Sequence, residues 1–293
     1  MGAVELLVCP VCGAGVSSDG AHLFCLGKKR HLYDIASSGY VNLLPPGRMS
    51  NSRAGDDKTM IRSRSEFLDR GYYSKISERA AQLIAPFANG SHISFADLAC
   101  GEGYHTCNVI KSLSALGVSS TALGFDASKY GAEKGAKRAR RLPNDADVFF
   151  AAANIFSLPV KDLSLDAATC LFAPIPWEES ARVLKDGGRL LVASSGERHL
   201  FELREALYDE PRTASGEVAA SGGFTETHAE TLSYRVTLGS NEDIMSLFGM
   251  TPFFYKTSPR DAEKLSRLDS LGVTVEVKFT IFEKNHAGDK TTI

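Results

Sequence analysis

The residues best suited to chemistry surround a pair of glycines that lie between two acidic residues. Asp97, Gly101 and Gly103 form an Asp-x-x-x-Gly-x-Gly motif after an apolar run, and Asp126 ends the next apolar run. Glycines let a ligand touch the backbone, and a helix that begins behind them offers unpaired N–H groups. A carboxylate at the end of the second strand can accept hydrogen bonds from ribose hydroxyls. The pattern predicts a site for a nucleoside-like ligand, with an empty turn as the alternative.

The type of nucleoside follows from what surrounds the glycines. A dinucleotide fingerprint needs a third glycine, and Thr106 stands at that position. The Asp97 carboxylate would repel a pyrophosphate but suits an ammonium or sulfonium group. This motif resembles the first motif of S-adenosylmethionine-dependent methyltransferases, and Asp126 resembles their second. The sequence departs from that pattern at Ala99, where the usual residue is glycine.

A second set of residues suited to chemistry lies near the N-terminus. Cys9 and Cys12 form a C-x2-C knuckle, and Cys25 and His31 follow. Together they predict a closed Cys3His zinc site, which would supply folding energy to a segment too short for its own core. His22 is the rival fourth ligand, but on a strand it would point away from Cys25. Free thiols and a redox C-x-x-C are the remaining alternatives.

Composition limits the class of protein. The chain has 293 residues, 43% hydrophobic and 23% charged, with a formal net charge of −2. These values are typical of a globular chain with one sizeable domain and a small one. We expect no membrane span, no secretory signal and a cytoplasmic location. Between Lys28 and Arg64 the sequence has eight Lys or Arg against three acids, a local surplus that suits nucleic-acid phosphates.

Apolar runs alternate with amphipathic stretches, which predicts an open parallel sheet with helices on both faces. The ligand should then lie at the carboxyl ends of the strands. The expected strands are residues 93–98, 121–126, 148–152, 165–172, 189–193, 232–238 and 273–282. Helices are expected within residues 57–68, 76–84, 109–116, 128–140 and 181–188, and from about residues 241 and 260.

Longer motifs along the chain resemble those of one specific enzyme family. The zinc spacing is followed by Asp34 and by Gly39-Tyr40-Val41-Asn42-Leu43-Leu44. Further matching motifs are Gly55-Asp56, Met60, Phe67-Leu68-x-x-Gly71-x-Tyr73, Asp97 to Tyr104, Arg198-His199-Leu200-x-Glu202-Leu203 and Met250-Thr251-Pro252-Phe253. Together they resemble the bacterial large-subunit (23S) ribosomal RNA guanine-N1 methyltransferases. The gap between Cys25 and His31 is longer than in that family.

The resemblance implies a Rossmann-like class I S-adenosylmethionine-dependent methyltransferase of class EC 2.1.1, with an N-terminal zinc module for RNA recognition. Those enzymes methylate a hairpin near the peptide exit tunnel, one branch is associated with macrolide resistance, and the family includes homodimers. The corresponding division is a zinc-binding module (residues 1–36), a connector with a helical segment (37–88), a methyltransferase domain (89–285) and a tail (286–293).

Site residues follow from the motifs and from the chemistry of guanine N1. The expected cofactor contacts are Asp97, Ala99, Gly101, Gly103, Tyr104, His105, Asp126, Ala127, Asn154, Ile155 and Leu171. N1 loses its proton as the methyl group arrives, so the site needs a proton acceptor, for which His199 is the candidate. We expect Phe172 to stack on an extruded guanine and the backbone around Pro174 to hold the edge of the base.

Other activities are less consistent with the sequence. Enzymes that methylate exocyclic amines carry Asn/Asp-Pro-Pro-Tyr/Phe where this chain has Leu171-Phe172-Ala173-Pro174. Cys170 lies on the strand, where it is expected to be a small buried hydrophobe rather than a nucleophile. A small-molecule, quinone-like methyltransferase would need neither the zinc module nor the basic connector. A catalytically inactive RNA-binding protein is the second alternative. It is favoured by Ala99, the departure from the cofactor motif.

Overall fold

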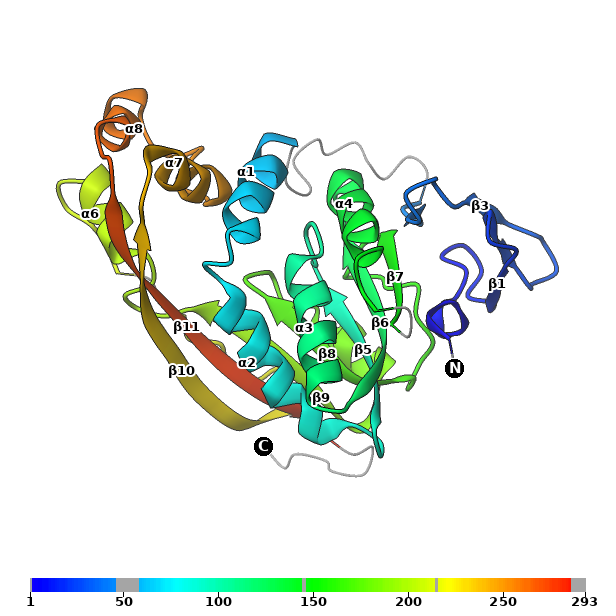
Figure 1. Cartoon of the computed structure of the whole chain (residues 1–293). Coiled ribbons are helices and arrows are strands. Elements are labelled where there is room, and N and C mark those ends of the chain that lie inside the picture. The colour runs from blue at the N-terminus through cyan, green and yellow to red at the C-terminus, as the bar shows by residue number, and fades with distance from the viewer. Residues whose placement is uncertain (1, 46–57, 144–145, 214–215, 286–293) are drawn as a thin grey trace.

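The computed structural model describes residues 2–45, 58–143, 146–213 and 216–285. In these residues a three-stranded sheet near the N-terminus accompanies an eight-stranded sheet (Figure 1). The N-terminal module lies at one end of the molecule, and α6, α7 and α8 lie at the other. Part of the predicted connector (residues 46–57), which includes the Gly55-Asp56 motif, and the predicted tail at 286–293 lie outside the described residues.

The large sheet has the strand order β10-β11-β9-β8-β5-β6-β7-β4. The chain runs from β5 to β6 and β7 on one side, then crosses to β8 and β9 on the other, so the topology switches beside β5. Strands β4 to β9 pair in parallel, as the alternation of strands and helices predicts, whereas β11 runs antiparallel to both β9 and β10, so the sheet is mixed. The strands are β4 (Val41–Asn42), β5 (His92–Leu98), β6 (Ser119–Asp126), β7 (Asp147–Ala152), β8 (Leu165–Leu171), β9 (Leu184–Ser195), β10 (Phe224–Leu238) and β11 (Leu271–Lys284).

Most predicted helices form, but one prediction was wrong. The helix expected at residues 181–188 is α5, which begins at Trp177 and ends at Val183. Leu184 already pairs with Leu165, and Arg189 pairs with Ala167, so residues 185–188 bulge out of the strand. The helices are α1 (Lys58–Asp69), α2 (Ser74–Ile84), α3 (Tyr104–Ala115), α4 (Lys129–Ala139), α5 (Trp177–Val183), α6 (Phe201–Leu207), α7 (Asn241–Met250) and α8 (Pro259–Ser266), with short 3-10 turns η1 (Ala3–Leu6) and η2 (Ala85–Phe87).

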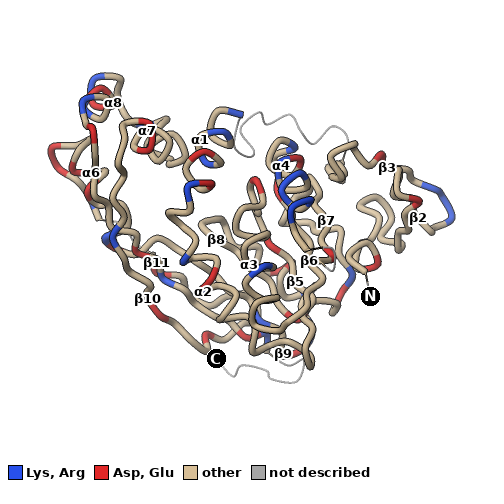
Figure 2. Tube along the Cα trace, in the orientation of Figure 1, with Lys and Arg blue, Asp and Glu red and all other residues tan. Residues whose placement is uncertain are grey.

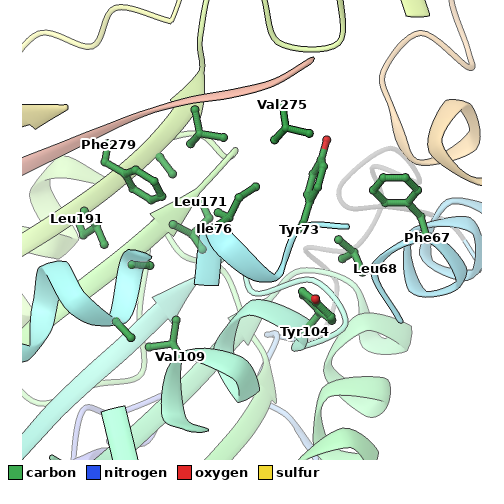
Figure 3. Packing of buried hydrophobic residues seen from close by; sticks show 14 of the residues in the cluster. Phe67, Leu68, Tyr73, Ile76, Tyr104, Val109, Leu171, Leu191, Val275 and Phe279 are labelled. Atoms are coloured by element: carbon green, nitrogen blue, oxygen red, sulfur yellow. The ribbon is translucent and has the colours of Figure 1, made fainter. Parts of the chain in front are cut away.

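Each face of the large sheet has its own hydrophobic core. On one face, side chains of α2 and α3 such as Ile76 and Val109 pack with Phe279 of β11 and with Phe67 of α1 (Figure 3). Alternation along β5 sends Phe95 to this face and Leu98 to the other. The loop ends of the strands are therefore held from both sides.

The N-terminal module packs directly against the large sheet through backbone hydrogen bonds and shared buried side chains. Its small sheet is formed by β1 (Val16–Ser18), β2 (His22–Cys25) and β3 (Leu32–Asp34). The backbone N–H of Val8 donates to the carbonyl of Pro159 (2.9 Å), and β4 extends the large sheet beside β7. Leu6 and Leu23 are buried in the same cluster as Phe125 of β6. This shared core fixes the module relative to the strand ends.

Candidate functional site

The backbone between β5 and α3 bends sharply at the predicted glycine loop. Gly101 and Gly103 have φ values of 56° and 74°, in the left-handed region that glycine tolerates. Ala99 also lies there, with φ of 64°. This conformation is costly for a residue with a Cβ, so the position that departs from the family pattern is one where glycine would be unstrained.

Close helix packing accounts for Gly103. A Cβ there would lie 2.7 Å from the Cα of Gly135 on α4 and 2.9 Å from the ring of Phe150. Gly101 is different, since the nearest atom to its notional Cβ is Nη1 of Arg64 at 3.4 Å. Gly101 therefore faces a side chain from α1 rather than the packed core.

Asp97 forms the floor of the loop. Its carboxyl is 2% exposed and accepts hydrogen bonds from the hydroxyls of Thr106 on α3 and Thr169 on β8, the second at 2.8 Å. Burial raises the pKa of Asp97 to about 6, and the two threonines oppose that rise. The carboxyl joins β5, β8 and α3 and concentrates negative charge beneath the loop.

Asp126 holds the loop against the end of β6. Its carboxylate accepts the backbone N–H of Gly101 (2.9 Å) and that of Ser128 (2.7 Å). The side chain is half-buried, as is that of Ala127 beside it. A carboxylate oxygen has more than one lone pair, so these bonds leave acceptor capacity for ribose hydroxyls.

The neighbouring strand ends offer an apolar surface to a base. Ile155 and Leu171 are 8% and 9% exposed, and they follow β7 and end β8 respectively. Asn154 is exposed, but its side-chain oxygen accepts the backbone N–H of Phe156 (3.0 Å). The Asn154 oxygen is thus engaged within its own turn, and its NH2 group remains a donor in an exposed side chain.

Tyr104 and His105 turn away from the loop. The Tyr104 ring lines a polar cavity of about 330 Å3 between α2, α3 and α4, beside Arg138. His105 lies 2.8 Å from the hydroxyl of Ser77 on α2 through Nδ1. Burial, helped by the charge of Arg64, lowers the pKa of His105 to about 3. His105 is therefore neutral, and Tyr104 presents only its backbone to the loop.

Phe172 follows β8 in a strained conformation, with φ of 57° and a side chain that is 39% exposed. Its ring stacks on His199, with centroids 5.8 Å apart and an interplanar angle of 29°. The outer face of Phe172 is therefore available to a base, and His199 supports the inner face. The next residues close the loop, since the Cys170 thiol donates to the carbonyl of Pro174 (3.5 Å).

His199 is a weaker proton acceptor than the sequence suggests. Its Nδ1 accepts the backbone N–H of Glu276 (3.2 Å), so Nε2 carries the proton and faces the hydroxyl of Tyr73 (3.3 Å). Burial lowers the pKa of His199 to about 4. Both ring nitrogens are engaged, which favours a supporting role behind Phe172. Tyr73 could not be recognised as its partner from local patterns, because 126 residues separate the two.

Cys170 is fully buried on β8, and burial raises its pKa to about 12. A thiol in this environment stays protonated and is a poor nucleophile. Its expected role as a small buried hydrophobe agrees with this placement.

The four predicted metal ligands come together. The donor atoms of Cys9, Cys12, Cys25 and His31 all lie within 4.8 Å of one another. Cys9 Sγ is 3.4 Å from His31 Nδ1, and Cys12 Sγ is 3.3 Å from Cys25 Sγ. Donors around a tetrahedral zinc ion are about 3.5–3.8 Å apart, so the set fits zinc.

The surroundings of Cys25 favour its thiolate form. The Gly27 backbone N–H, with His31, lowers the pKa of Cys25 to about 6. The hydroxyl of Tyr33 lies 3.1 Å from Cys9 Sγ and is placed to donate to it. The rival ligand His22 is elsewhere, with Nδ1 3.2 Å from Asp19.

Basic side chains gather on α4 and on the turn between β2 and β3 (Figure 2). The turn carries Lys28, Lys29 and Arg30, which are mostly exposed. On α4, several cations are used within the fold, as Lys134 donates to Ser65 (2.9 Å) and Arg138 pairs with Asp69 (2.5 Å). The turn is therefore the more accessible positive surface.

Three arginines on α1 and just after it differ in what they contact. Arg62 pairs with Glu66 (2.7 Å) and Arg70 with Glu242 (2.7 Å), whereas Arg64 reaches the glycine loop. Periodicity along the chain could not distinguish them, because Arg64 and Arg70 meet residues of other elements.

Comparison with known proteins identifies both parts of the chain. Residues 7–50 match a zinc-ribbon family model described as "RlmA, N-terminal", and residues 89–246 match one described as "Methyltransferase domain". The chain is 30% identical to the "23S rRNA (guanine(748)-N(1))-methyltransferase" of Streptomyces fradiae, over 95% of this chain and 96% of that protein. YxjB of Bacillus subtilis, assigned provisionally to 23S rRNA (guanine-N1) methylation, is 28% identical over 93% of this chain and 95% of its own length.

A Micromonospora griseorubida protein with the same provisional assignment is 30% identical, covering 92% of this chain and 93% of that protein.

Among the described residues, no helix is both long and apolar enough to cross a bilayer.

Proposed function

Since the chain belongs to the family of 23S rRNA (guanine-N1)-methyltransferases, we propose that it methylates N1 of one guanine in a hairpin of large-subunit ribosomal RNA. S-adenosylmethionine supplies the methyl group when bound. The observation that carries the proposal is the match along 95% of the chain to an enzyme of that activity, which includes the zinc module as well as the methyltransferase domain.

Each part of the strand-end site has a task in this reaction. Asp126 holds the ribose of the cofactor, Ile155 and Leu171 contact its adenine, and the Asp97 charge favours its cationic end. The extruded guanine stacks on Phe172, and backbone carbonyls around Pro174 hold its edge. The N1–methyl bond would form as the bond between the methyl group and sulfur breaks, and the N1 proton would pass to solvent water. Alignment of N1 with the methyl group supplies much of the rate gain.

The zinc module recognises the RNA in this proposal. Lys28, Lys29 and Arg30 lie on the turn between two of its strands, exposed and separate from the glycine loop. Such cations position phosphates without reading sequence. Zinc, held by Cys9, Cys12, Cys25 and His31, fixes the fold of that module. A cytoplasmic location, a homodimer and a part in macrolide resistance are further elements of the proposal.

The test is methyl transfer to naked RNA. Purified protein with labelled S-adenosylmethionine should modify 23S ribosomal RNA at a single guanine, and mass mapping should find 1-methylguanine there. Asp126→Ala is the matched control and should lose cofactor affinity. Labelling of quinones or other small molecules alone would support the rival methyltransferase, and absence of cofactor binding would support an inactive RNA-binding protein.

A further inference from the structure

Arg64 on α1 differs from the neighbouring arginines in what it faces. Arg62, two residues earlier and about 200° around the same helix, is exposed and pairs with Glu66 at 2.7 Å. Arg64 is half-buried, and its Nη1 lies 3.4 Å from the place where a Cβ of Gly101 would be. Its guanidinium therefore lies directly over the bare backbone of the glycine loop.

The electrostatic surroundings agree with this placement. Glu102, the residue between the two loop glycines, is fully buried, and the charge of Arg64 opposes the rise that burial causes in its pKa. The same charge helps to lower the pKa of His105 in the first turn of α3. Arg64 thus acts on residues on both sides of Gly103, although it comes from a helix that precedes the whole domain in sequence.

Contacts on either side of Arg64 hold it in place. Ser65 accepts a hydrogen bond from Lys134 of α4 (2.9 Å), and Asp69 pairs with Arg138 of α4 (2.5 Å). On the other flank, Ser63 packs so closely against Gly249 of α7 that a Cβ on that glycine would lie 2.7 Å from its hydroxyl. Helix α1 is therefore fixed to both α4 and α7, which sets the reach of the guanidinium.

The charges around the loop suggest what the guanidinium binds. Asp97 lies beneath the loop and Asp126 beside it, so the cationic groups and the ribose of the cofactor have acidic partners there. The carboxylate of the methionine moiety is the anionic group of S-adenosylmethionine, and it needs a cation or N–H donors. A guanidinium presents a planar pair of donors that matches a carboxylate.

We infer that Arg64 binds the carboxylate of the methionine moiety of S-adenosylmethionine at the glycine loop. This assignment rests on the proposed function, since it requires that cofactor. It makes α1 part of the cofactor site, together with the strand ends of the methyltransferase domain. The two competing roles for Arg64 are to hold an RNA phosphate, or only to neutralise Glu102.

A pair of ligands separates these roles. S-adenosylhomocysteine carries the carboxylate, whereas 5′-methylthioadenosine has the same nucleoside without the amino-acid moiety. Arg64→Gln should weaken binding of S-adenosylhomocysteine about 10- to 100-fold in calorimetry, and binding of methylthioadenosine less than about twofold. Arg64→Lys should recover part of the loss, because it restores the charge but not the fork. Arg62→Gln is the matched control and should change neither affinity.

Equal weakening of both ligands by Arg64→Gln would overturn the inference in favour of neutralising Glu102. Unchanged binding of both ligands, with loss of affinity for 23S ribosomal RNA, would overturn it in favour of an RNA phosphate. Wild-type protein that binds neither ligand would instead refute the proposed function. Thermal melting of each variant shows whether it is folded.

Discussion

Asp97→Asn tests whether the carboxyl beneath the glycine loop is as destabilised as its burial implies. Burial raises the pKa of Asp97 from 3.8 to about 6. Below about pH 3.8 the carboxyl is protonated in both the folded and the unfolded chain, and there is no penalty. Between those pH values the folded protein keeps a proton that the unfolded chain releases, so stability falls as pH rises. Above about pH 6 the penalty is constant at about 3 kcal/mol.

The assay is urea unfolding of the wild type and of Asp97→Asn at pH 5 and pH 7.5, with zinc present. Asparagine has the same shape and cannot ionise, so the difference in unfolding free energy isolates the carboxyl and cancels other groups. We expect this difference to shift by about 1.4 kcal/mol in favour of the variant between the two pH values. A difference that does not change with pH would show that Asp97 titrates normally and would refute the account of its burial.

The same variant should separate stability from function. The hydroxyls of Thr106 and Thr169 donate to different oxygens of Asp97, so asparagine keeps an acceptor for one hydroxyl and offers an NH2 donor to the other. It removes the negative charge that faces a cationic cofactor. We therefore expect the variant to be more stable at pH 7.5. We also expect it to bind S-adenosylmethionine at least about tenfold more weakly, because one charge-assisted interaction is lost. Cofactor affinity equal to that of the wild type would remove Asp97 from the binding site.

Three further predictions address other parts of the molecule. Ala99→Gly should raise the unfolding free energy by about 0.5–1 kcal/mol, because it relieves a left-handed φ of 64°; a lower melting temperature would contradict this. Cys12→Ser should lower zinc content by mass spectrometry, the melting temperature and RNA affinity, with S-adenosylhomocysteine affinity within about threefold of wild type; retention of full RNA affinity would exclude the module from recognition. Phe172→Ala should lower kcat/KM for RNA at least about tenfold, with cofactor Kd within about twofold, and Phe172→Tyr should retain most activity; equal kinetics for all three proteins would exclude stacking.

Features set by neighbouring residues could be predicted from the sequence. Ser128 caps α4 by accepting from Gly131 (3.4 Å), and the helix begins at the next residue, as its sequence indicates. Ser240 does the same for α7 through Asp243 (3.2 Å). Apolar runs that end in Asp97 and Asp126 mark two adjacent strands correctly, because burial on both faces requires such runs.

Features that depend on residues distant in the sequence could not be predicted from local patterns. The direction of β11 depends on pairing with β9, and nothing local distinguishes it from a parallel strand. The start of β10 at Phe224 is hidden because its exposed polar residues give no continuous apolar run. His199 illustrates the same limit within the site. Its residue type suggests a base, but its protonation is decided by Glu276 and Tyr73, which come from other parts of the fold.

Backbone strain gives an independent argument for where the site lies. Three of the four described residues other than glycine with a positive φ, Ala99 (64°), Phe172 (57°) and Leu200 (54°), follow β5, β8 and β9 at the same edge of the sheet. The fourth, Leu163 (50°), precedes β8. Each costs about 1–2 kcal/mol relative to an ordinary conformation. Such strain persists only where the surrounding packing maintains it, and it concentrates where a protein binds or reacts. Leu200 is 3% exposed and lies in the hydrophobic core at the start of α6, where its packing holds the loop that also carries His199. The hydrophobic core of this protein therefore stabilises the fold and also holds the ends of three strands in the shape that a cofactor and a base require.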